Sequence, residues 1–186
     1  MTKLDEEFVS GEDVYRGGFL RVRRDVVRLP DGTQTTREYI HHPGAVAIVA
    51  LTAAGEVILE RQHRYPHRRD FIEIPAGKRE PGEESLVTAK RELEEETGYA
   101  ARDWTRLGLV HNAIAYSDEG IEIWLATGLE QRAAKLDEGE FLEVLRRPFG
   151  EALAMAADGR LTDVKTIVGL FWADAHARGG RRGGAG

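Results

Sequence analysis

The sequence contains no cysteine among its 186 residues, and this absence removes three kinds of chemistry. Disulfide bonds, thiolate nucleophiles and zinc–thiolate sites all require cysteine, so none of them is available to this chain. A metal site or a nucleophile in this protein must therefore be built from other side chains or from backbone groups.

The chain also lacks an excess of positive charge and a long apolar run. Its formal net charge is −6, with 26 Lys+Arg against 32 Asp+Glu, which gives no general attraction to nucleic acid or to an anionic membrane. The longest apolar run, residues 45–54, is too short to span a membrane and is typical of a buried strand. Residues 1–10 lack the basic-then-apolar pattern of an export signal. We therefore expect a cytoplasmic protein that binds neither nucleic acid nor membrane.

What remains is the composition of an ordinary globular protein, with 41% hydrophobic and 31% charged residues. A chain of this length can form one domain with a sizeable core and a small extra layer. Alternating or apolar patterns predict strands over 19–28, 36–42, 44–51, 56–62, 70–75, 104–111, 119–126 and 140–146. Helical patterns cover 84–97, 148–160 and 161–178, the last with Thr162 or Asp163 as its N-cap. This order of elements predicts an α+β layered fold with a mixed sheet.

The end of the first predicted helix carries an unusual charge. Residues 91–98 (RELEEETG) place four glutamates in five positions near a helix C-terminus, where the macrodipole disfavours each carboxylate by about 0.3–1 kcal/mol. Glu92 and Glu96 lie about 40° apart around the helix axis, and Glu95 lies in the same half. A hard divalent cation such as Mg²⁺ would supply the counter-charge that these carboxylates need. Taken alone, the run also fits a solvated helix face.

The spacing of residues 77–99 favours the metal-binding alternative. These residues follow the pattern G-x5-E-x7-R-E-U-x-E-E-x-G-U, where U is a bulky, usually aliphatic residue. This pattern is the signature of the Nudix hydrolases, and the chain resembles that family at every fixed position. Only Tyr99 differs mildly, because it is aromatic. The resemblance implies an α/β/α sandwich with a mixed sheet. It also implies an enzyme that hydrolyses a nucleoside diphosphate linked to another group.

The resemblance also implies roles for individual residues. Two to three Mg²⁺ (or Mn²⁺) ions would be held mainly by two glutamates and one backbone carbonyl, and Arg91 would hold Glu95 from one helical turn away. The residues concerned are Ala76 (through its carbonyl), Glu92 and Glu96 as metal ligands, Glu95 and Arg91 as catalytic residues, and Gly77, Glu83 and Gly98 as supports of the motif. Glu94 points elsewhere and is interpreted as a solvated residue.

The flanking segments are similar to the ADP-ribose and nucleotide-sugar pyrophosphatases within the family. The segments are 58–78 (ILERQHRYPHRRDFIEIPAGK), 115–126 (AYSDEGIEIWLA) and 136–144 (LDEGEFLEV). In the third segment, Glu138 corresponds to the general base and Glu140 to a further metal ligand, although a solvated acidic loop would look the same.

Two arginines are candidate contacts for the pyrophosphate, because guanidinium groups can pair with phosphate oxygens. Arg64 matches an arginine of the related pyrophosphatases, and Arg79 lies in the loop at the front of the signature. Most of the basic run 61–69 also fits a solvated surface. Ile114 stands where enzymes acting on ADP-ribose usually carry proline, so GDP-mannose or another nucleotide sugar stays open as the substrate.

The resemblance further implies three parts and an assembly. Residues 1–43 would form an N-terminal antiparallel β extension that makes a homodimer, residues 44–178 the catalytic domain, and residues 179–186 a disordered Gly/Arg tail. Two alternatives stay open: a non-catalytic regulator of Nudix fold that binds a nucleotide sugar, and a Nudix hydrolase for GDP-mannose or dinucleoside polyphosphates. A hydrolase of RNA caps is disfavoured because the chain is acidic and lacks a dense basic stripe.

Overall fold

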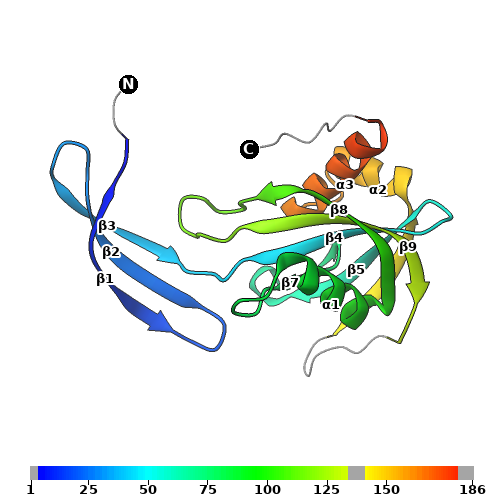
Figure 1. Cartoon of the computed structure of the whole chain (residues 1–186), viewed down its shortest axis with the longest axis horizontal. Helices are drawn as coiled ribbons and strands as arrows, with labels where there is room; N and C mark the ends of the chain where they lie inside the picture. The colour runs from blue at the N-terminus through cyan, green and yellow to red at the C-terminus, as the bar shows by residue number, and fades with distance from the viewer. Residues whose placement is uncertain (1–3, 134–140, 180–186) are drawn as a thin grey trace. The chain divides into compact units, whose positions relative to one another are not determined.

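The structure, a computed structural model, describes residues 4–133 and 141–179. It divides into two compact units, and Figure 1 labels most of their strands and helices. One unit contains Met1–Gly44 and His111–Gly120, and the other contains Ala45–Val110 and Ile121–Gly186.

The first unit is built on a three-stranded antiparallel sheet. Its strands are β1 (Glu7–Arg16), β2 (Arg21–Arg28) and β3 (Gln34–Ile40), in that order across the sheet. The Pro-Asp-Gly turn between β2 and β3 forms the predicted hairpin, in which the Gly32 N–H donates to the Leu29 carbonyl at 2.9 Å. Strand β1 was missed by the sequence patterns, because all ten of its side chains are exposed and none marks a buried face.

A loop from the other half of the chain joins this unit at the end of β3. The Ile40 N–H donates to the Tyr116 carbonyl, and the Asp118 N–H donates back to the Ile40 carbonyl. The Asp118 carboxylate also accepts from the backbone of His42 and contacts the ring of His41. Residues 111–120 therefore belong to the β extension in space, although they lie far along the chain.

The second unit contains a seven-stranded mixed sheet. The strand order is β10-β5-β4-β9-β8, with β6 added to β5 and β7 added to β4; β4 and β9 run parallel and the other pairs antiparallel. The strands are β4 (Ala45–Leu51), β5 (Glu56–Arg64), β6 (Arg69–Glu73), β7 (Ala76–Lys78), β8 (Tyr99–Val110), β9 (Ile121–Gln131) and β10 (Leu142–Pro148). A short 3-10 helix, η1 (Tyr65–His67), connects β5 to β6.

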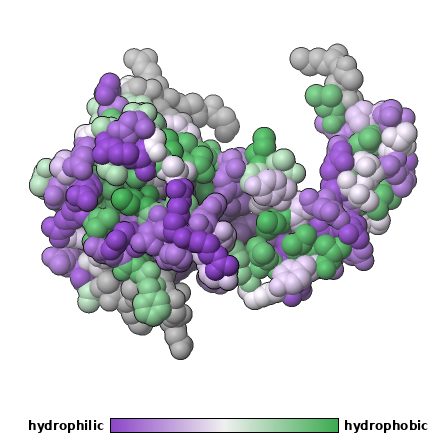
Figure 2. All heavy atoms as spheres, turned by 180° about the vertical axis from the view of Figure 1, so that it is seen from behind, coloured by the Kyte–Doolittle hydropathy of each residue, from purple (hydrophilic) through white to green (hydrophobic). Residues whose placement is uncertain are grey.

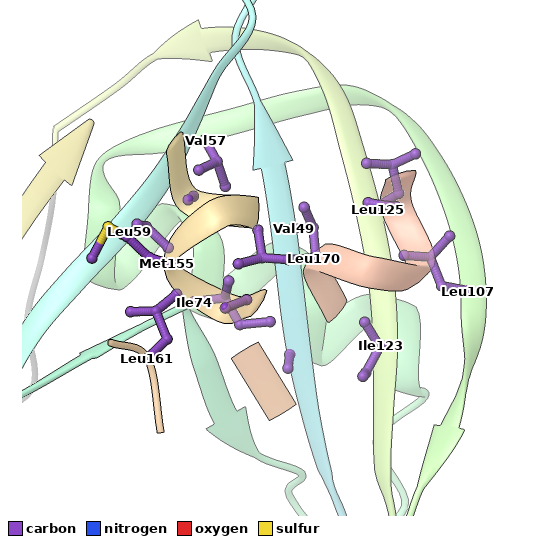
Figure 3. Packing of buried hydrophobic residues seen from close by; sticks show 14 of the residues in the cluster. Val49, Val57, Leu59, Ile74, Leu107, Ile123, Leu125, Met155, Leu161 and Leu170 are labelled. Carbon is purple, nitrogen blue, oxygen red and sulfur yellow. The ribbon is translucent and has the colours of Figure 1, made fainter. Parts of the chain in front are cut away.

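Helices cover both faces of this sheet. They are α1 (Ser85–Thr97), α2 (Phe149–Ala157) and α3 (Val164–Ala177). Because side chains alternate along a strand, β4 supplies Val46 and Ile48 to the core under α1, which includes Leu93. It supplies Val49 to the opposite core, where Leu170 of α3 packs (Figure 3). The predicted α/β/α sandwich with a mixed sheet is confirmed.

The start of β8 differs from the sequence prediction, whereas the N-cap of α3 is one of the two residues predicted. Strand β8 begins at Tyr99 instead of residue 104, because the chain leaves α1 directly into the strand after the turn at Gly98. Helix α3 begins after Asp163, whose carboxylate accepts a hydrogen bond from the Thr166 N–H at 3.0 Å and caps the helix. Among the described residues, no helix combines the length and the apolar composition that crossing a membrane requires.

Candidate active site

Helix α1 places its carboxylates beside the buried core. Ala89 and Leu93 are fully buried against the sheet, while Glu94 is exposed, as the sequence predicts. The helix ends at Gly98, which adopts the left-handed conformation (φ 69°) and donates its N–H to the Glu94 carbonyl at 3.0 Å. The helix therefore ends directly after its acidic last turn, with Leu93 anchoring it to the sheet.

Arg91 gathers three carboxylates of the signature around one guanidinium group. It donates to Glu92 Oε1 at 2.9 Å and, one helical turn on, to Glu95 Oε2 at 3.0 Å. Its Nε and Nη2 atoms also donate to the two oxygens of Glu83, at 3.2 Å and 3.1 Å. The predicted contact between Arg91 and Glu95 is therefore present, and two further glutamates share the same cation.

These contacts keep Glu83 ionised. Hydrogen bonds from Arg91, and then from the backbone N–H of Glu80, lower the pKa of Glu83 to about 2. The pKa of Arg91 is raised in turn, chiefly by its hydrogen bond to Glu83. Glu83 is therefore a carboxylate at neutral pH, and its two oxygens are held by Arg91.

Gly77 makes room for one of these carboxylates. A Cβ atom added to this glycine would lie 1.9 Å from Glu92 Cδ and 2.0 Å and 2.3 Å from its two carboxylate oxygens. Real Cβ atoms essentially never come that close to another heavy atom. The glycine of the signature is thus explained by a close approach between β7 and the side chain of Glu92.

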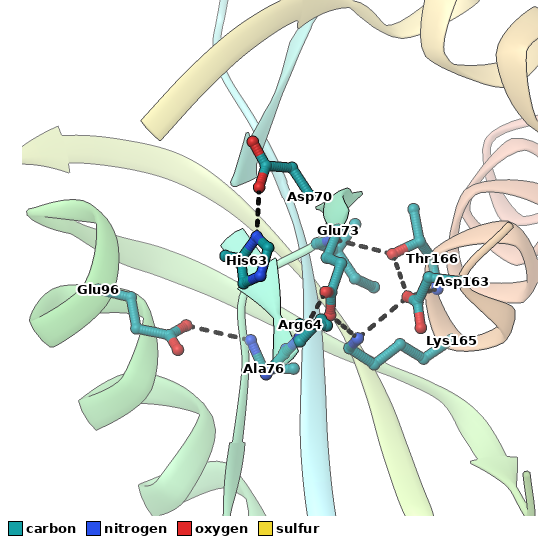
Figure 4. A network of polar contacts seen from close by, with 10 residues as sticks. His63, Arg64, Asp70, Glu73, Ala76, Glu96, Asp163, Lys165 and Thr166 are labelled. Atoms are coloured by element: carbon teal, nitrogen blue, oxygen red, sulfur yellow. Dashed lines mark hydrogen bonds and ion pairs between the residues drawn. The ribbon is translucent and has the colours of Figure 1, made fainter. Parts of the chain in front are cut away.

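The last glutamate of the signature is held by the same strand. Glu96 is buried, and its Oε2 accepts the N–H of Ala76 at 3.1 Å (Figure 4). The hydrogen bond fixes this carboxylate next to the backbone of β7. Glu92 and Glu96 therefore both lie against the segment 76–77, in which the resemblance implies the Ala76 carbonyl as a further metal ligand.

This set of donors fits a hard divalent cation. Carboxylates and a backbone carbonyl are the oxygen ligands that Mg²⁺ and Mn²⁺ prefer. The Glu92 carboxylate occupies the space beside Gly77, which leaves no room there for a side chain on residue 77. Within residues 4–133 and 141–179, however, no three acidic or histidine side chains already stand in a metal-binding arrangement. The carboxylates contact Arg91 and the Ala76 N–H in this structure.

The remaining predicted residues divide into three groups. Arg79 donates to the carbonyl of Glu83 at 3.1 Å and 2.6 Å and so supports the loop ahead of α1. Arg64, at the end of β5, forms a bidentate pair with Glu73. Glu138 and Glu140 lie outside the residues that the structure describes.

Tyr99, the aromatic residue at the last position of the signature, contacts Arg146. Tyr99 is buried, its hydroxyl accepts a hydrogen bond from Arg146 of β10, and the Arg146 guanidinium lies 5.4 Å from the ring centroid. An aliphatic residue could pack in the same place but could not accept this hydrogen bond. Tyr99 therefore links the end of the signature to β10.

Sequence reasoning missed a polar network at the beginning of α3. Glu73 of β6 accepts from Arg64 and from Lys165, and Lys165 also donates to Asp163 at 3.0 Å (Figure 4). Thr166 connects the helix to the strand, because its Oγ1 accepts from the Ile74 N–H at 2.9 Å. The only sequence signal was a glutamate between apolar residues in a short strand.

Burial alone would raise the pKa of Glu73. The hydrogen bonds and charges of Arg64 and Lys165 outweigh it and lower that pKa to about 2. Glu73 is therefore a charged, nearly inaccessible group whose ionisation depends on two cations.

Comparison with known proteins agrees with this geometry. A model of the NUDIX domain matches residues 41–167, which is more than half of the chain. The chain belongs to the Nudix family. A second model, the nucleoside diphosphate sugar hydrolase N-terminal domain, matches residues 6–40, which include all three strands of the small sheet. The resemblance inferred from the signature is confirmed, and Nudix hydrolases generally use divalent metals.

Several relatives match almost the whole chain. The ADP-ribose pyrophosphatase of Bacillus subtilis is 39% identical over 172 residues, covering 91% of this chain and 93% of that protein. The methanol dehydrogenase activator of Bacillus methanolicus is 38% identical over 173 residues, covering 91% and 94%. The ADP-ribose pyrophosphatase of Mycobacterium tuberculosis is 36% identical over 174 residues, covering 92% and 84%.

A solved structure supports the fold. The crystal structure of an ADP compounds hydrolase superposes with a TM-score of 0.83, covering 96% of this chain and 98% of that one, at 23% identity. The two chains therefore share the Nudix architecture and its N-terminal sheet.

Proposed function

We propose that this Nudix protein hydrolyses the pyrophosphate bond of a nucleotide sugar, with ADP-ribose as the first substrate to test. The products would be a nucleoside monophosphate and a sugar phosphate. The observation that carries the proposal is the intact carboxylate cluster, in which Arg91 holds three glutamates and Gly77 leaves space for Glu92. Two relatives of 39% and 36% identity named ADP-ribose pyrophosphatase support the choice of substrate.

We infer that Glu92, Glu96 and the Ala76 carbonyl hold the metal, with two to three Mg²⁺ or Mn²⁺ ions per site. When bound, such ions neutralise the pyrophosphate and lower the pKa of the attacking water. Arg91 keeps Glu92 and Glu95 on the side of α1 that faces β7, and the Ala76 N–H keeps Glu96 there. These contacts limit the rearrangement that binding requires.

Two loop acids complete the proposal. Glu138 would accept the proton of the attacking water, and Glu140 would add a metal ligand. Both assignments rest on the resemblance of 136–144 to the acidic loop of related pyrophosphatases. Comparing E138Q with E140Q separates the roles, because loss of a general base alters the pH profile of kcat while loss of a ligand raises the metal concentration needed.

Arg64 and Arg79 are the proposed contacts for the pyrophosphate. Arg64 supports this role because its side chain is about two-fifths exposed. Its pKa is raised chiefly by the hydrogen bond to Glu73, with a smaller contribution from the charge of Glu96, whose carboxylate contacts the Ala76 N–H. Arg79 has a structural contact with the Glu83 carbonyl, and we propose that it binds phosphate from there.

A panel of substrates tests the proposed function. ADP-ribose, ADP-glucose, GDP-mannose, a dinucleoside polyphosphate and NADH would each be incubated with Mg²⁺ or Mn²⁺, with products identified by mass. GDP-mannose is the second candidate, because Ile114 replaces the usual proline and two relatives of 32% identity are named GDP-mannose pyrophosphatase. Turnover of none of these compounds would refute the proposal and favour a non-catalytic regulator. The cytoplasmic location stays a prediction from the sequence.

We also propose that the small sheet makes a homodimer. Strand β1 is an exposed edge strand ten residues long, and Phe8 and Phe19 are 65% and 71% exposed. Apolar side chains appear among polar ones at the surface in Figure 2. An uncovered edge strand of this kind favours pairing with another chain. F8E should shift the mass measured by light scattering from dimer to monomer, while F171E, at an exposed phenylalanine of α3, should not; a monomeric wild type would contradict the proposal.

A further inference from the structure

Lys165 and Arg64 share one buried carboxylate, although they come from different parts of the chain. Arg64 Nε and Nη2 donate to the two oxygens of Glu73, each at 2.7 Å, and Lys165 donates to Glu73 Oε2. Figure 4 shows the two side chains converging on the Glu73 carboxylate. Lys165 stands at the first turn of α3, where it also contacts Asp163.

The three side chains differ in their access to solvent. Glu73 is 6% exposed and Lys165 is 12% exposed, whereas Arg64 is 43% exposed. All three line a pocket of about 310 Å³. Glu73 and Lys165 are therefore nearly inaccessible to solvent. Arg64 is the member of the group that a ligand can reach.

A buried carboxylate requires a cation at all times. If Arg64 were the only partner of Glu73, turning its donors toward a phosphate would leave a buried charge unpaired, which is strongly unfavourable. With Lys165 in place, the carboxylate keeps one cation, and the five N–H donors of the guanidinium can be divided between Glu73 and a second anion. The second cation thus lowers the cost of using Arg64 to bind a ligand.

We propose that Lys165 is a positioning residue for substrate binding, which keeps Glu73 charge-paired and fixed so that Arg64 is oriented toward the pyrophosphate and free to bind it. The inference rests on the proposed function, in which Arg64 contacts phosphate. Helix α3 contributes to the site through this path: Lys165 acts on Glu73, Glu73 acts on Arg64, and Arg64 meets the substrate. Asp163 and Thr166 hold the beginning of the helix at the required place.

The test is a double-mutant cycle in substrate hydrolysis. K165M removes the ammonium and retains most of the apolar stem, so Arg64 must neutralise Glu73 alone; kcat/KM should fall about tenfold, with most of the change in KM. In K165R, which restores the charge, kcat/KM should return to within about threefold of wild type. Adding K165M to R64M should change kcat/KM less than twofold, because the two residues act in series. K90M, at an exposed lysine of α1, is the control for losing a lysine.

Each outcome decides the question. Wild-type KM in K165M, or losses in K165M and R64M that multiply in the double variant, would overturn the inference while leaving the proposed function intact. Absence of turnover in the wild-type protein would refute the proposed function, and this inference with it. If K165M is unfolded at the assay temperature, K165Q, which keeps an N–H donor, is compared in the same cycle; it should show the same rise in KM at a smaller magnitude, and wild-type KM would again refute the role.

Discussion

Gly77→Ala separates the function of the signature glycine from its effect on folding. The added methyl group would lie 1.9 Å from Glu92 Cδ, where ordinary contacts begin at 3.4 Å. The carboxylate must therefore move by about 1.5 Å, the difference between these two distances. Because this is the far end of a flexible side chain, it can rotate away without disturbing the sheet. The backbone itself accepts alanine, since Gly77 is not among the residues with positive φ.

The expected result is a nearly normal fold with poor activity. The free energy of unfolding should change by no more than about 1 kcal/mol, or about 2–4 °C in Tm, because a gain in backbone rigidity offsets the displaced side chain. A misplacement of more than about 1 Å at a reacting centre can cost a factor of about 100, so kcat/KM should fall by about that factor.

The assays are hydrolysis of the best panel substrate across a Mg²⁺ titration and thermal unfolding of the same samples. G150A is the matched control, because a Cβ atom at Gly150 meets nothing within 4 Å. G77A combined with E92Q should be no less active than E92Q alone, since the alanine acts through Glu92. Wild-type activity in G77A, or a fall in Tm of more than about 10 °C, would refute the reasoning.

Two other predictions concern charge and metal. Since the pKa of Glu73 is about 2 in the folded protein instead of the ordinary 4.5, its ionised form contributes stability that is present above pH 4.5 and is lost as the pH falls toward 2. Urea unfolding should show that wild type loses about 3 kcal/mol more than E73Q over this interval, and equal losses would contradict the assignment. Mg²⁺ at about 100 times its dissociation constant should raise the Tm of the wild-type protein by about 5–10 °C. The shift should be much smaller in E92Q, and an equal shift would place the metal elsewhere.

The sequence predicted the parts of the site that are local in the chain. The spacing of 77–99 gave the identities of the clustered glutamates, the partner of Glu95 and the end of the helix at Gly98, because a helix converts spacing directly into position. The reason for Gly77 could not be predicted, because it depends on how closely β7 approaches Glu92.

Contacts between residues far apart in the chain could not be predicted from the sequence. Lys165 and Glu73 are 92 positions apart, and nothing in either segment indicates that the other is its partner. Strand β1 was not predicted, because all of its residues are exposed and its sequence shows no alternation of polar and apolar residues. The resemblance predicted Arg64 as a phosphate contact, but only the structure shows that its guanidinium pairs with the carboxylate of Glu73.

The most direct test of the central claim compares wild type with E96Q in the hydrolysis of ADP-ribose in Mg²⁺. Glutamine keeps an oxygen that can accept the Ala76 N–H, so the fold should survive while the charged metal ligand is lost. Mass spectrometry should find AMP and ribose 5-phosphate with the wild-type protein, and turnover in E96Q should fall at least about 100-fold with a far-UV circular dichroism spectrum like that of wild type. Wild-type turnover in a folded E96Q would contradict the claim that the glutamates of α1 hold the catalytic metal.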